Sequence, residues 1–275
     1  MTILLRIGLT PIVFTLVSKA QSRFGDWIGG RLIGLPVTTG PFLVTVCLTA
    51  SRGSAAHAAA GVTTGQLAVV AFCSAYAWTS RRFGALGATV ASLAIALSAV
   101  LGLSAFAGPW TAAAAVWTLI ATSLLLWPWA SPVAGHDREP APAASQAPSQ
   151  PAPILTRAIV STCVVASMSA LVPVLGARPA GVISSAPILL SIILPGTHRR
   201  NGAASAAAVA RGTIVSMTAT IAFSAVLATS LPQMAAGSAL LLAAGVLAAL
   251  VAVSPLLDRT LAQAGSALGR PEPVF

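Results

Sequence analysis

The sequence is a series of long apolar segments separated by short breaks, and these breaks hold most of the charged residues. A helix crosses the hydrocarbon core of a bilayer with about 20 mostly apolar residues, or somewhat fewer where flanking side chains snorkel. Nine segments meet this condition, so we predict an all-α, polytopic transmembrane helical bundle. The predicted spans are Ile3–Val17, Ile33–Ala50, Ser54–Trp78, Ala85–Phe106, Trp110–Trp129, Ile154–Val174, Pro179–Pro195, Ala203–Thr229 and Met234–Ser254.

The composition excludes an ordinary soluble domain. Only 7% of the 275 residues are charged and 56% are apolar, whereas a soluble domain carries about 25% charged residues. The net charge of +10 does not indicate a nucleic-acid partner, because Lys and Arg stand singly or in pairs with no basic stripe and no interleaved aromatic residues. The cysteines Cys47, Cys73 and Cys163 lie in apolar runs without His or Cys at ligand spacing, so no metal or other cofactor is predicted.

The chain divides near its middle. Residues 130–153, rich in Pro, Ala, Ser and Gln, are predicted to form a flexible cytoplasmic linker. Residues 1–129 form a first membrane half with five spans, and residues 154–254 a second half with four. Residues 255–275 are predicted to be a cytoplasmic tail.

The positions of Lys and Arg predict the orientation. Cytoplasmic loops carry an excess of Lys and Arg. Only Arg52 and Arg178 fall in the even-numbered connections, and Arg6 and Arg211 lie inside spans. We therefore predict an inner-membrane protein with its amino terminus outside and its carboxyl terminus in the cytoplasm. Eleven basic residues fall in the odd-numbered connections or the tail: Lys19, Arg23, Arg31, Arg81, Arg82, Arg138, Arg157, Arg199, Arg200, Arg259 and Arg270.

The two halves resemble each other weakly. Residues 30–48 align with residues 176–194, which sets Pro41 opposite Pro187 and Thr38-Thr39 opposite Ser184-Ser185. Each segment is followed by a basic turn and an Ala-rich helix, although chance similarity remains an alternative in so Ala-rich a chain. The predicted orientation makes the two copies antiparallel, and inverted repeats of this kind are typical of secondary transporters.

Each aligned segment is predicted to be a broken helix. Proline removes a backbone donor and disfavours helix at the preceding residue, and Pro41 and Pro187 lie near the midpoints of their spans. Non-helical backbone at that depth is tolerated only where it is buried in protein or lines a cavity. A plain kink, in which Ser or Thr satisfies the freed carbonyl, is the alternative. The predicted solute-binding residues at the breaks are Thr38, Thr39, Gly40, Pro41, Ser184, Ser185 and Pro187.

Polar residues inside the other spans are few. No Asp or Glu lies within a predicted span, which argues against proton relays built on carboxylates and against cationic substrates. Gln66 and Arg211 are predicted to occupy nearly corresponding places in the two copies and to belong to the binding site. Arg211 either contacts an anionic group or snorkels to the cytoplasmic interface.

Residues 35–42, Leu-Pro-Val-Thr-Thr-Gly-Pro-Phe, resemble the LPxxTxPF pattern of urea transporters, which are also inverted-repeat channels. The similarity covers only this short segment. The second copy departs from it, because it has no Leu-Pro and has Ile188 where the pattern has Phe. Nothing else in the chain resembles that family, and we assign the chain to no family on this basis.

These features predict a permease, a secondary transporter of a small neutral or anionic solute, and not an enzyme. The expected partners are the lipid bilayer and the solute, with a second copy or a membrane subunit as a further possibility. The alternative is a non-transporting scaffold or accessory subunit that binds a protein or lipid through small-residue helix faces. Midplane breaks favour the permease, because a scaffold has no need of them.

Overall fold

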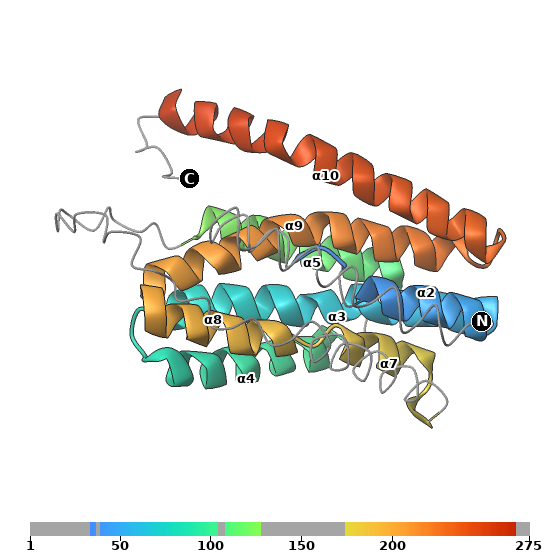
Figure 1. The fold of residues 1–275 in the computed structure, drawn as a ribbon, viewed down its shortest axis with the longest axis horizontal. Coiled ribbons are helices and arrows are strands. Elements are labelled where there is room, and N and C mark those ends of the chain that lie inside the picture. Colours follow the sequence, from blue (N-terminus) through green and yellow to red (C-terminus); the bar gives the residue numbers. More distant parts are fainter. Residues whose placement is uncertain (1–33, 37–38, 104–107, 128–173, 268–275) are drawn as a thin grey trace, which may run out of the picture.

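The structure is a computed structural model that describes residues 34–36, 39–103, 108–127 and 174–267. Every element in these ranges is an α-helix, and they contain no strand. Figure 1 shows the helices as an elongated bundle with α10 leaning away from it. The helices are α2 (Thr39–Thr49), α3 (Arg52–Thr79), α4 (Ala85–Leu103), α5 (Pro109–Leu125), α7 (Ala177–Ser184), α8 (Ile188–Asn201), α9 (Ala203–Ser230) and α10 (Ala236–Ala267).

Four of the described helices, α3, α4, α9 and α10, are long and apolar enough to cross a membrane, and α2 and α5 are shorter apolar helices. The predicted all-helical class is confirmed, and the structure is compatible with a helical membrane protein. The predicted span Ile3–Val17, the linker and all of the span Ile154–Val174 except Val174 lie outside the described residues. The count of nine spans and the orientation therefore stay predictions.

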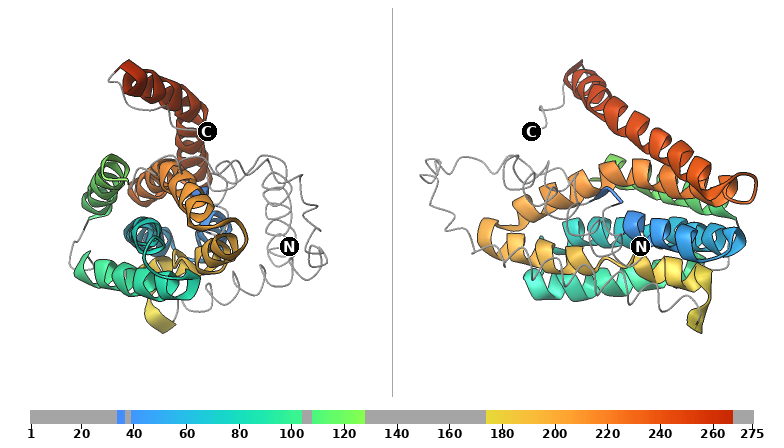
Figure 2. Two further views of the ribbon diagram at one scale, coloured as in Figure 1. Left: turned by 90° about the vertical axis from the view of Figure 1, so that its left-hand side faces the viewer. Right: turned by 45° about the vertical axis from the view of Figure 1, so that its right-hand side comes forward.

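The centre of the bundle is formed by α3 and α9. In the most apolar stretch of each helix, 83% of the residues are buried in α3 and 72% in α9, whereas only 28% are buried in α4 and 11% in α10. The start of α3 shares a hydrophobic cluster with the end of α9, and the end of α3 shares another with the start of α9, so the two helices run antiparallel. In the end-on view of Figure 2 the remaining helices surround this pair.

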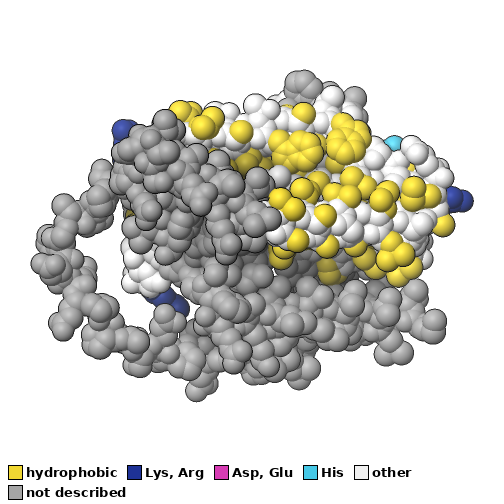
Figure 3. Space-filling view, turned by 90° about the horizontal axis from the view of Figure 1, so that it is seen from above, with side chains coloured by type: hydrophobic (Ala, Val, Ile, Leu, Met, Phe, Trp, Pro, Cys, Tyr) yellow, Lys and Arg dark blue, Asp and Glu magenta, His cyan; other side chains and the backbone are white. Residues whose placement is uncertain are grey.

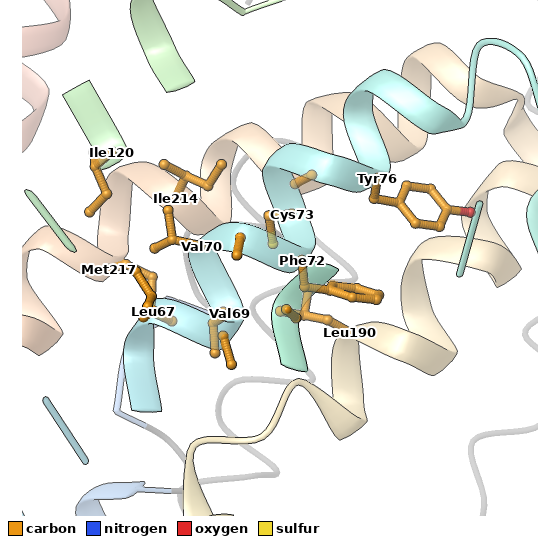
Figure 4. Packing of buried hydrophobic residues seen from close by; sticks show 14 of the residues in the cluster. Leu67, Val69, Val70, Phe72, Cys73, Tyr76, Ile120, Leu190, Ile214 and Met217 are labelled. Atoms are coloured by element: carbon orange, nitrogen blue, oxygen red, sulfur yellow. The ribbon is translucent and has the colours of Figure 1, made fainter. Parts of the chain in front are cut away.

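The packing around α3 is apolar along most of its length. Figure 4 shows Leu67 and Val70 beside Met217 of α9, and Phe72 beside Leu190 of α8. The outer surface is also apolar. In the described part of the face drawn in Figure 3, hydrophobic side chains spread over the middle, and the visible Lys and Arg side chains lie toward its two ends. Such a distribution suits a surface surrounded by lipid.

The helix boundaries recur at a fixed interval along the chain. The central helices α3 and α9 are equally long, and the interval that separates their first residues, Arg52 and Ala203, also separates their last, Thr79 and Ser230. The same interval separates Ala85, the first residue of α4, from the first residue of α10, Ala236. We call this spacing the helix interval.

The turns after the two central helices agree as well, because their backbone hydrogen bonds recur at the helix interval. After α3, backbone N–H groups donate to backbone carbonyls from Ser80 to Tyr76, Arg82 to Thr79, Phe83 to Thr79 and Ala88 to Gly84. After α9, the same kind of bond runs from Leu231 to Leu227, Gln233 to Ser230, Met234 to Ser230 and Ala239 to Ala235.

One predicted boundary is wrong. The sequence predicts a turn at His198-Arg199-Arg200, but these residues form the last turn of α8. The helix ends at Gly202, whose φ of 90° is a conformation that residues with a side chain rarely adopt. Basic side chains are stable in a last turn because they face the negative end of the helix dipole, so they end the apolar run without ending the helix. The predicted span end at Ser254 agrees with the apolar part of α10, Ala236–Ser254, and the helix itself continues to Ala267.

Candidate functional site

The predicted span Pro179–Pro195 is interrupted, and residues 185–187 separate α7 from α8. Pro187 has no N–H and disfavours helix at the residue before it. The last turn of α7 tightens, so that the N–H of Ser185 donates to the carbonyl of Val182 at 3.1 Å. The predicted interruption next to Pro187 is therefore present.

A second interruption precedes α2. Gly34 is helical, Leu35 and Pro36 form a bend, and α2 begins only at Thr39. Pro41 lies in the first turn of α2, where proline is tolerated. The sequence predicts the interruption at Pro41, but it lies before this residue.

The break between α7 and α8 packs directly against α3. A Cβ added to Gly61 would meet the carbonyl of Arg178, and one added to Gly181 would meet the backbone of α3. A Cβ on Gly65 would lie 2.7 Å from the Cβ of Ser185. Glycines spaced four residues apart thus let the two backbones touch, as small residues do at helix interfaces in membranes.

Ser185 marks the height of this break along α3. Its side chain is 4% exposed, and its hydroxyl lies 3.3 Å from the carbonyl of Val62. Gly65, which faces Ser185, and Gln66 are the two middle residues of α3. The break is therefore level with the midpoint of α3.

The other break packs against α9. The hydroxyl of Thr220 donates to the carbonyl of Gly34 at 2.7 Å, and a Cβ on Gly34 would meet the hydroxyl of Ser216 and the carbonyl of Thr213. Ser216 and Met217 are the two middle residues of α9. Each break thus lies at the midpoint of a different central helix, on segments far apart in the sequence.

Two polar side chains of α3, Thr63 and Gln66, are buried beside Val62 and Gly65, the residues that contact Ser185. Thr63 is fully buried, and its hydroxyl lies 2.9 Å from that of Ser224 on α9 and 3.0 Å from the carbonyl of Ala59. Gln66 is 2% exposed. Its side-chain oxygen is buried and accepts no hydrogen bond from any residue that the structure describes. A buried acceptor without a partner is costly, so it points to a group that occupies this position.

The remaining predicted residues are placed as follows. Thr39 is 5% exposed at the start of α2, Gly40 is half-buried, and Pro41 and Pro187 are buried. Ser184 is half-buried, and its hydroxyl donates to the carbonyl of Gly181. Thr38 lies outside the described residues.

Gln66 lies at the middle of α3, whereas Arg211 lies in the first third of α9, so their predicted correspondence depends on how the two halves are aligned. At the helix interval, Met217 corresponds to Gln66, and Arg211 corresponds to Ala60. Arg211 is half-buried, in contrast to the fully enclosed Gln66.

Several groups at the site are not among the residues predicted from the sequence. Thr63, Thr220 and Ser224 are hydroxyl residues inside apolar helices and have no local signal. The glycines Gly61 and Gly65 do have one, because their spacing of four residues is typical of close helix packing.

No protein-family model matches this sequence, and no curated protein or solved structure matches it. The chemistry of the site is therefore inferred from its own residues. The described residues hold no group of three or more His, Cys, Asp or Glu that could bind a metal ion. The groups at the two breaks are hydroxyls, one amide and backbone, which suit hydrogen bonding to a small polar molecule.

Proposed function

We propose that the chain is an integral membrane permease that binds a small solute between its two helix breaks and moves it by alternating access. The main support is the pair of interruptions, each packed at the midpoint of one of two antiparallel central helices. Within a bilayer, non-helical backbone is stable only where protein buries it or where it lines a cavity. Secondary transporters build their binding sites from discontinuous helices of this kind.

The helix interval supports two halves of one ancestral fold. At this interval Pro36 corresponds to Pro187 and Gly34 to Ser185, so that the two breaks coincide. The sequence alignment instead uses a shorter interval, which pairs Pro41 with Pro187. We adopt the helix interval, because helix boundaries and turn hydrogen bonds are less prone to chance agreement than hydroxyl residues in an Ala-rich chain. The antiparallel course of α3 and α9 favours an inverted relation between the halves.

We further propose that the protein lies in the inner membrane with a cytoplasmic carboxyl terminus, on the basis of the eleven-to-two charge bias. Its partners are the bilayer and the solute, with no role for nucleic acid, and it is not an enzyme. In the broad form of the proposal the solute is neutral or anionic, the residues predicted at the breaks and Gln66 bind it, and Arg211 contacts it only if it is anionic.

A membrane scaffold is the second candidate, and α10 favours it. This helix extends away from the bundle (Figures 1 and 2) and exposes large apolar side chains, Leu241 being 76% and Val251 39% exposed. A protein partner could cover this face, but so could lipid. The two midpoint breaks have no purpose in a scaffold, which is why we favour the permease.

Reconstitution tests the proposal. Purified protein in liposomes is exposed to gradients of acetamide, glycerol and nitrate, and vesicle volume is followed by stopped-flow light scattering. We expect at least one flux above that of protein-free liposomes. Ser185→Ala should lower it, whereas Thr122→Val, which removes a hydroxyl from the exposed face of α5, should not. No flux with any solute would favour the scaffold.

A further inference from the structure

Ser185, Thr220 and Thr63, three hydroxyl residues at or near the two breaks, have already donated their protons. A hydroxyl has one proton to donate and lone pairs to accept. Ser185 donates to backbone carbonyls at 3.3 Å, and Thr220 donates to the carbonyl of Gly34 at 2.7 Å. Thr63 uses its proton on Ala59 or Ser224. These hydroxyls can therefore offer a solute only lone pairs.

Gln66 adds a further acceptor at the same height. Its side-chain oxygen is buried and has no donor among the described residues. Successive residues of a helix are about 100° apart around its axis. Gly65 packs on α7 and Thr63 packs on α9. Gln66 therefore points between these two faces of α3. The unpaired acceptor is thus directed toward the corner between the α7 break and α9.

The corresponding position in α9 carries no such group. Met217 corresponds to Gln66 at the helix interval and packs against apolar residues of α3 (Figure 4). Two halves with the same helix boundaries therefore differ in chemistry at their centres. An unpaired buried amide destabilises a protein by itself, so its presence in one half alone points to a ligand.

We infer that the solute is uncharged and carries an N–H or O–H group that donates a hydrogen bond to Gln66. This inference rests on the proposed permease function and narrows its solute class. An anion would need several donors, and Ser185, Thr220 and Thr63 have none left, so only the amide N–H groups of Gln66 could donate to it. Arg211 does not supply the others, because it lies six residues before Met217, about 120° away around α9. A cation would meet lone pairs, but no predicted span carries an Asp or Glu whose carboxylate could balance its charge.

Two amides that differ in their donors provide the test. Acetamide carries N–H donors, and N,N-dimethylacetamide keeps the carbonyl without them. We expect wild-type protein in liposomes to carry acetamide, and glycerol as a second donor, well above the protein-free rate. Dimethylacetamide, nitrate and methylammonium should pass at the protein-free rate. This comparison requires no variant.

Gln66→Met introduces at position 66 the residue that α9 carries at the corresponding position, Met217, and keeps the side-chain length. We expect acetamide flux at subsaturating concentration to fall about tenfold, the effect of one hydrogen bond of about 1.4 kcal/mol. The melting temperature should stay unchanged or rise. As a matched control, Thr122→Val on the exposed face of α5 should leave flux unchanged.

Three results would overturn the inference. Faster flux of nitrate or methylammonium than of acetamide would assign another solute class and leave the permease intact. A melting temperature that falls by several degrees in Gln66→Met would show that the amide oxygen has a donor within the protein. Unchanged acetamide flux in the variant would exclude the hydrogen bond. Absence of any flux in the wild type would instead remove the permease itself.

Discussion

Replacing Gly65 with alanine tests whether the α7 break is held directly against α3. The added Cβ would lie 2.7 Å from the Cβ of Ser185 and from the carbonyl oxygen of Val182, whereas ordinary contacts begin at 3.4 Å. The break would have to move by about 0.7 Å, the difference between these distances. Overpacking of this kind costs about 1–3 kcal/mol, and we expect the upper part of that range because the carbonyl belongs to the backbone and cannot rotate away.

Gly245→Ala is the matched control. A Cβ on Gly245 in α10 would meet nothing within 4 Å. Both variants gain the helix propensity of alanine, worth up to about 1 kcal/mol, so the difference between them isolates the steric contact. Thermal unfolding in detergent, followed by tryptophan fluorescence, should place Gly65→Ala several degrees below Gly245→Ala. Equal or higher stability of Gly65→Ala would refute the described packing of the break.

Three further predictions concern the polar residues. Thr39→Val and Ser185→Ala should reduce solute flux while membrane levels stay near normal, because each hydrogen bond contributes only about 0.5–1.5 kcal/mol to folding; normal flux in both would exclude them from the site. Arg211→Gln should leave the flux of neutral solutes unchanged, and a selective loss of anion flux would instead place its guanidinium in the site. Tyr76→Phe removes a 3.2 Å hydrogen bond to His198 that links α3 to α8, and should lower the free energy of unfolding by about 1 kcal/mol; a change below about 0.3 kcal/mol would show that this bond contributes little.

The sequence predicts the long helices well. The spans expected at 54–78 and 203–229 correspond to α3 and α9 within two residues at each end, because an unbroken apolar run flanked by turn residues has one stable form in a bilayer. The interruption next to Pro187 is also predictable, since proline acts on its own backbone. Its extent, residues 185–187, agrees with that local effect.

Other features depend on tertiary packing and could not be predicted. The bond between Thr63 and Ser224 joins residues 161 positions apart, and no local pattern specifies such a pair. The sequence alignment pairs Pro41 with Pro187, whereas the proposed helix interval pairs Pro36 with Pro187; Thr and Ser recur often enough in this chain to align by chance. The basic residues at the end of α8 suggest a turn, although the positive φ of Gly202 is what ends that helix.

The most direct measurement of the central claim, a solute site at the α7 break, is the access of water to Ser185. Ser185→Cys is placed in a chain whose Cys47, Cys73 and Cys163 are replaced by serine. It is then treated in liposomes with a charged, membrane-impermeant thiol reagent. Phe83→Cys in the exposed turn after α3 is the positive control, and Leu97→Cys on the apolar face of α4, 62% exposed, is the negative control.

We expect Ser185→Cys to react from the aqueous side, more slowly than Phe83→Cys, and acetamide to slow the reaction further by occupying the site. Leu97→Cys should not react in the bilayer. The contrary result is a cysteine at position 185 that is as unreactive in the bilayer as Leu97→Cys but reacts after unfolding in detergent. It would show that the break is permanently sealed from water, which would contradict the permease account.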